Sequence, residues 1–90
     1  MIKYTTNTLK KLEQMLEETG MTVRYEKGSF ASGYCILQDR HVVVVNKFYP
    51  LDARIDTLLE IIDEHGVDES KLSDQSRKLM AKIRKTKENN

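Results

Sequence analysis

Two acidic side chains and one histidine near residue 60 have the spacing of a binding site. Glu60 and Glu64 are four residues apart, which puts both carboxylates on one face of a helix, as two ligands of one metal ion require. His65 follows directly but points about 100° away from Glu64 around the helix. Two carboxylates without a clear third ligand predict at most a weak metal site at Glu60, Glu64 and His65. The simpler interpretation is a solvated acidic face, and we expect no cofactor.

The other reactive side chains have structural explanations. Cys35 is the single cysteine and stands in an apolar segment without an adjacent histidine, so we expect a small buried hydrophobe and not a nucleophile. One cysteine forms no internal disulfide, which fits a reducing compartment. His41 opens a predicted strand, and His65 ends a predicted helix, where its positive form suits the helix dipole. The sequence contains no phosphate-binding glycine loop, nucleophile elbow or Cys/His zinc spacing.

Hydrophobic periodicity predicts the elements that position these residues. Apolar residues at offsets of three and four indicate helices, and alternating ones indicate strands. The predicted elements are a helix at 5–19, strands at 21–26, 34–38 and 41–47, and helices beginning at Pro50 and Ser73. Small residues over 28–33 predict a turn or bulge, and Asp39 with Arg40 predicts a tight hairpin turn. The valine run at 42–45 predicts that the third strand is the centre of the sheet.

The order of these elements predicts the fold class. Three consecutive, closely linked strands favour an antiparallel meander, so we expect an α+β fold: a helix, a three-stranded antiparallel sheet, then two helices. Ninety residues suffice for one modest core, which we assign to a single domain over residues 1–84. Residues 85–90 contain no apolar side chain, so we expect a frayed C-terminal tail.

Charge is uneven along the chain although the formal net charge is only +1. Residues 51–69 carry seven acidic side chains against one base, and residues 71–90 carry seven bases against two acids. One interpretation is a basic helix that contacts nucleic-acid phosphates through Lys78, Lys82 and Lys85. The simpler one, which we favour, is a basic helix lying beside the acidic helix. No aromatic residue stands between the bases, so we expect no nucleic-acid partner.

About half of the chain, residues 21–66, resembles the core of the ImmA/IrrE-type zinc peptidases. The resemblance rests on residues 25–37, on the strand at 42–47 with its Val-Asn finish, and on the segment 54–65. In that family a meander leads through an arginine-containing turn into a helix that reads T-L-x-H-E-x-x-H. The chain also resembles small bacterial proteins of about this length whose activity is unknown.

The resemblance implies a relative without the catalytic residues. Aligning Thr57 and Leu58 with the family's T-L places Glu60 and Glu64 at the zinc-binding histidines, and Ile61 at the catalytic glutamate. Isoleucine accepts no proton, so the general base of a zinc hydrolase is missing from this alignment.

We therefore expect a non-catalytic protein-interaction module that binds another protein or forms a homodimer. Strand 34–38 has apolar residues on both faces. A small domain has too few elements to cover both faces, so we expect a partner to cover the rest. A metal-dependent hydrolase remnant using Glu60 and Glu64 is the alternative, together with nucleic-acid binding through the basic helix. No segment has the length and apolar character of a signal peptide or membrane span, so we expect a cytoplasmic protein without a membrane partner. The resemblance to small bacterial proteins implies a bacterial source.

Overall fold

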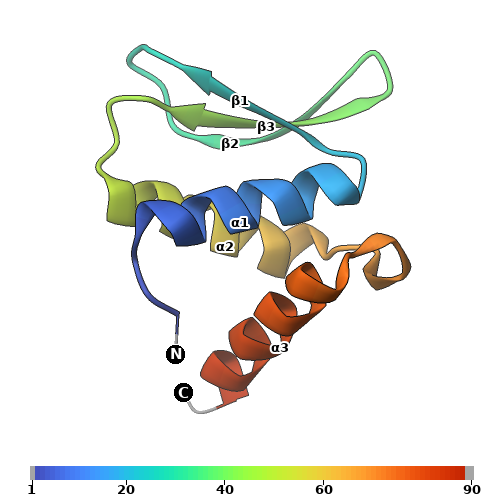
Figure 1. Cartoon of the computed structure of the whole chain (residues 1–90). Helices are drawn as coiled ribbons and strands as arrows, with labels where there is room; N and C mark the ends of the chain where they lie inside the picture. Colours follow the sequence, from blue (N-terminus) through green and yellow to red (C-terminus); the bar gives the residue numbers. More distant parts are fainter. Residues whose placement is uncertain (1, 89–90) are drawn as a thin grey trace.

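The fold is α+β, with helices and strands in the order that the sequence predicts. The computed structural model describes residues 2–88. Its elements are α1 (Thr6–Glu18), β1 (Thr22–Glu26), β2 (Gly33–Leu37), β3 (Arg40–Asn46), α2 (Leu51–His65), the short 3-10 helix η1 (Glu69–Lys71) and α3 (Asp74–Glu88). Helices α1 and α2 lie side by side against one face of the sheet, and α3 packs beneath them (Figure 1). No helix in this part of the chain is long and apolar enough to cross a membrane.

The sheet is mixed, so the predicted antiparallel meander is wrong. The strand order is β1-β3-β2; β1 pairs with β3 in parallel, and only β2 and β3 are antiparallel. A meander would have placed β2 at the centre. Strand β3 has side chains buried on both faces, among them Val42 and Val43, and therefore gains most from a neighbour on each edge. The prediction that the valine strand is central is confirmed.

Asn46, at the end of β3, holds the loop that makes this strand order possible. Residues 27–32 run from β1 to β2 across the end of β3. The Asn46 side-chain amide donates to the carbonyls of Gly28 and Phe30, both at 2.8 Å, and its oxygen accepts from the Phe48 amide at 3.0 Å. The Asn46 backbone amide donates to the Ser32 hydroxyl. Through its side chain and its backbone amide, this one buried residue joins the crossing loop to β3 at Gly28, Phe30 and Ser32.

The hairpin turn lies one residue earlier than predicted, at Gln38 and Asp39. Their φ angles are 50° and 65°, so both residues are left-handed, as in a type I′ turn. This turn matches the natural twist of the two strands that it joins. Its left-handed conformation is adopted most readily by glycine, and then by asparagine and aspartate, so the strain is greatest at Gln38. The favourable twist of the hairpin explains why the chain accepts the strain.

Replacing Gln38 by Asn and Asp39 by Gly should stabilise the protein. Asn-Gly is the preferred type I′ pair, and relief of the left-handed strain should raise the free energy of unfolding by about 0.5–1 kcal/mol. Urea denaturation of the double variant measures this change. A midpoint at or below that of the wild type would contradict the assignment of strain to the turn.

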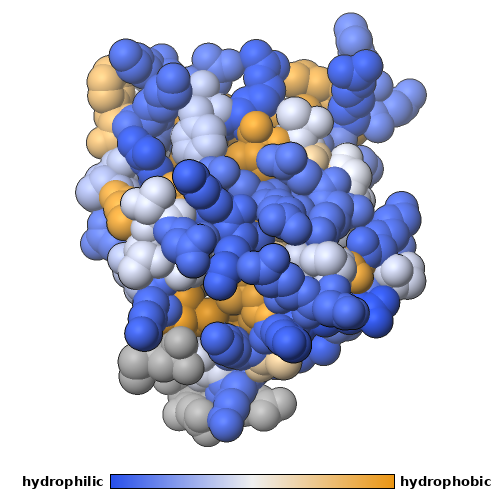
Figure 2. Space-filling view, viewed as in Figure 1, coloured by the Kyte–Doolittle hydropathy of each residue, from blue (hydrophilic) through white to orange (hydrophobic). Residues whose placement is uncertain are grey.

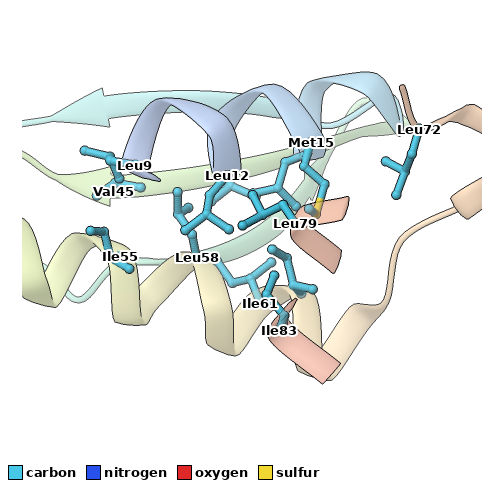
Figure 3. Close-up of a cluster of buried hydrophobic side chains, with 13 residues drawn as sticks. Leu9, Leu12, Met15, Val45, Ile55, Leu58, Ile61, Leu72, Leu79 and Ile83 are labelled. Atoms are coloured by element: carbon cyan, nitrogen blue, oxygen red, sulfur yellow. The ribbon is translucent and has the colours of Figure 1, made fainter. Parts of the chain in front are cut away.

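The core lies between the sheet and the helices (Figure 3). Helix α1 contributes Leu12 and Leu16, helix α2 contributes Ile55 and Leu58, and the sheet contributes Val43 with Val45. All six are completely buried. Helix α3 adds Leu79 and Ile83 at the edge of the same cluster. The apolar residues at three- and four-residue spacing therefore determine which face of each helix packs into the core.

Helix α3 is anchored to α1 by a carboxylate at its start. Ser73 caps the helix, as predicted: its hydroxyl accepts from the Ser76 amide at 3.3 Å. The Ser73 amide donates to Glu18 of α1. Hydrogen bonds from Ser76 and Gln14 lower the pKa of Glu18 from 4.5 to about 2. Helix α3 continues to Glu88, past residue 85 where the predicted tail begins, and residues 89–90 lie outside the described residues.

This anchor predicts a pH-dependent stability. Because the Glu18 pKa is depressed in the folded state, its contribution is complete above about pH 4.5 and is lost as the pH falls toward about 2. Glu18→Gln should therefore be less stable than the wild type at neutral pH, and the difference should shrink below pH 4.5. Glu17→Gln, at the exposed neighbouring position, is the control and should follow the wild type. A difference that stays constant with pH would argue against the anchor.

Candidate functional site

The structure brings the three predicted site residues to one cleft. Glu60, Glu64 and His65 line a cavity of about 470 Å³ between α2 and the start of β2. The other lining residues come from the two flanks of this cleft: Ser32, Gly33, Tyr34, Tyr49, Thr57 and Ile61. Sequence periodicity placed Glu60 and Glu64 on one helical face, but it did not show which strand lies opposite them. Tyr34 was missed for that reason, and Tyr49 was missed because it lies in the irregular segment between β3 and α2.

Helix α2 divides its side chains between core and cleft. Ile61 and Leu58 belong to the buried core cluster, whereas Glu60 and Glu64 are exposed. Within residues 2–88, the Glu60 carboxylate makes no hydrogen bond or ion pair. Ile61 is only 5% exposed, so the position at which the resemblance expects a catalytic glutamate holds a core side chain. The side of the cleft formed by α2 is thus mostly polar, with Glu60 and Glu64 beside Thr57 and the core residue Ile61.

Aromatic rings close one end of this cleft. The Tyr34 ring stacks on the His65 imidazole, with centroids 3.9 Å apart and planes inclined by 24°. The Tyr34 hydroxyl also hydrogen bonds to Nδ1 of His41. Nε2 of His65 lies 3.9 Å from a Glu64 oxygen, an ion pair when the imidazole is protonated. These contacts fix the His65 ring against the strand and place Glu64 beside it, which leaves Glu60 as the carboxylate without a partner among residues 2–88.

Metal binding has limited support in this arrangement. Among the described residues, no group of three or more His, Cys, Asp or Glu side chains is placed to hold a metal ion. Glu60, Glu64 and His65 share the cleft, but the His65 ring is stacked on Tyr34. The chemistry that the cleft supports most directly is electrostatic recognition of a positive group by two carboxylates.

Cys35 lies outside the cleft. Tyr34 packs against the core cluster on the helical side of the sheet, so side-chain alternation turns Cys35 to the opposite face. Cys35 is a free cysteine of intermediate exposure, which corrects the expectation that it is buried. All the helices of residues 2–88 lie on the other side of the sheet, which explains the exposure of Cys35 on this outer face (Figure 1).

The acidic and basic helices face one another across an apolar groove of about 540 Å³. Leu59 and Ile62 of α2 line it together with Met80 and Ile83 of α3. Figure 2 shows apolar surface where α3 meets the other helices, within a face that is otherwise mostly hydrophilic. The three predicted nucleic-acid contacts are exposed on α3: Lys78, Lys82 and Lys85. Arg84 of the same helix pairs with Glu69 of η1.

Comparison with known proteins adds no assignment. No protein family, curated protein or solved structure was found to match this chain.

Proposed function

We propose that this protein is an interaction module that binds an extended segment of another protein along strand β2. The observation that carries the proposal is the exposed apolar edge of the sheet. In the described part of the chain, strand β2 is an edge strand that pairs with β3 alone. Ile36 and Leu37 are 58% and 51% exposed, unusual for apolar side chains in a strand. A free edge of this kind is a template for strand addition.

The hairpin geometry supplies free backbone groups for such pairing. In a two-residue hairpin the residues flanking the turn, here Leu37 and Arg40, hydrogen bond to each other. Hydrogen-bonded and non-hydrogen-bonded pairs alternate from there, so the backbone groups of Tyr34 and Ile36 point to the open edge. A partner strand would bond to these groups. Ile36 and Leu37 project to opposite faces and would contact its side chains on both.

Charge at the cleft favours a partner segment with a basic residue. Glu60 and Glu64 lie beside the start of β2, so a strand added there passes over both carboxylates. A second copy added by antiparallel β2 pairing would place both α2 helices on the same side of the joined sheet. That arrangement brings the carboxylates of one copy toward those of the other. The repulsion favours a different chain over the homodimer.

A proline substitution tests edge pairing. Ile36→Pro removes only an outward-facing N–H and leaves the β2–β3 hydrogen bonds intact. Ile36→Thr is the matched control, because it keeps both the amide and a β-branched side chain. Peptides selected from a random library should alternate apolar residues and contain Lys or Arg. Ile36→Pro should weaken their binding by about tenfold or more, and Ile36→Thr by much less.

Three results would contradict the proposal. Selected peptides with helical spacing would place the site elsewhere, as would peptide binding that survives Ile36→Pro in a folded variant. Sedimentation equilibrium distinguishes self-association: a dimer that Ile36→Pro dissociates would make a second copy, and not another protein, the partner of β2.

A further inference from the structure

A second pocket gathers positive charge from four separate segments of the chain. It lies at the end of the molecule where α1 and α2 begin and where β1 and β3 finish (Figure 1). Lys10 of α1, Lys27 after β1, Lys47 after β3 and Arg54 of α2 all line it. Its volume is about 540 Å³, within the range of small-molecule sites. No pattern in the sequence joins these residues, because only the fold brings them together.

The positive charge of this pocket is not neutralised by neighbouring side chains. Lys10, Lys27 and Lys47 are exposed, and none of their amines makes a hydrogen bond or ion pair within the described part of the chain. The single acidic lining residue is Glu13, which accepts a hydrogen bond from the Tyr25 hydroxyl. Burial, together with this bond, raises the Tyr25 pKa, so the phenol stays protonated and neutral at physiological pH. The pocket therefore has four cations against one carboxylate.

Arg54 is the rigid member of the group. Its Nε donates to the Tyr49 carbonyl at 2.8 Å, and its Nη2 donates to the Lys47 carbonyl. Its guanidinium carbon lies 5.8 Å from the centre of the Tyr25 ring. Carbonyl groups hold the side chain without neutralising it, so its full charge is available to a ligand. These bonds use two of the five N–H donors of the guanidinium, so the other three can donate to phosphate oxygens.

Apolar groups complete the pocket between the cations. Leu9 is buried beneath it, and the half-buried Tyr25 ring forms part of its wall. We propose that this pocket binds a small phosphate monoester whose organic group is apolar or aromatic. A phosphate monoester carries up to two negative charges, so several converging cations attract it more strongly than they attract a single carboxylate. The site is independent of strand β2, because the two cavities share no lining residue.

Phenyl phosphate is a suitable probe, titrated into the full-length protein with backbone amide shifts as the readout. Saturable shifts should concentrate around Leu9, Lys27 and Lys47. Lys27→Gln combined with Lys47→Gln should weaken binding by about tenfold, since each variant removes a charge from the phosphate site. The affinity should also fall steeply with added salt. Arg54 is left unchanged because its carbonyl contacts hold the loop before α2.

Lys78→Gln combined with Lys82→Gln is the matched control: it removes two exposed lysines of α3, and binding should change less than about twofold. An equal loss of affinity in both double variants would show that phenyl phosphate responds to general surface charge, and would overturn the proposal. Benzoate binding as tightly as phenyl phosphate would exclude recognition of the phosphate. Tighter binding of a polyglutamate peptide or of single-stranded RNA would assign the surface to a polymer, and the absence of saturable shifts would exclude the site.

Discussion

Replacing Leu58 by alanine should lower the free energy of unfolding by about 3–4 kcal/mol. Leu58 is completely buried on α2, in the cluster formed with Leu12 of α1 and Val45 of β3 (Figure 3). Truncation removes its contacts with these neighbours and leaves a cavity that packed elements close only in part. A domain of this size has about 5–15 kcal/mol of total stability, so the loss takes a large share of it.

Leu37→Ala is the control for Leu58→Ala, because it removes the same atoms from a residue that is 51% exposed. Its effect should remain within about 0.5 kcal/mol. Urea denaturation of both variants at neutral pH gives the comparison. Equal effects would show that Leu58 is not part of a closely packed core. Because Leu58 fixes α2 under the sheet, its loss should also broaden amide signals along the cleft at Glu60 and Glu64.

Local pattern predicted the elements of this fold well, for a physical reason. The spacing of Leu9, Leu12 and Leu16 fixes which face of α1 is buried, and that information lies within a few consecutive turns. The run of valines similarly predicted that β3 is the central strand, without any information about its neighbours. The cap at Ser73 is also local, since it satisfies a backbone group of a single helix end.

The pairing of the strands could not be predicted from the local sequence pattern. Whether β1 pairs with β2 or with β3 depends on the route of residues 27–32, and a loop of that length allows either. Hydrogen bonds from Asn46 to carbonyls 18 and 16 residues away in sequence select the observed route. The residues that line the cleft opposite Glu60 and Glu64 could not be predicted for the same reason. They depend on β2 being the strand at the edge above α2.

Asn46→Asp should destabilise the protein by about 2–4 kcal/mol at neutral pH. Asn46 is 4% exposed, and its side-chain NH₂ donates to two carbonyl oxygens. Aspartate has nearly the same shape but only accepts hydrogen bonds when ionised, so both carbonyls lose a donor and face a buried charge. The crossing loop should then detach from the end of β3, and Gly28 and Phe30 amides should exchange with solvent faster.

The pH dependence of Asn46→Asp separates buried charge from simple loss of contacts. A carboxyl buried next to carbonyl oxygens favours its protonated form in the folded state, so its ionisation costs stability as the pH rises above about 4. The deficit relative to wild type should therefore be larger at neutral pH than in mild acid. Asn7→Asp, the same change at an exposed position in the first turn of α1, should have little effect or stabilise slightly. A deficit independent of pH would mean that the introduced carboxylate reaches solvent and that the deficit comes from the lost hydrogen bonds to Gly28 and Phe30, and not from a buried charge.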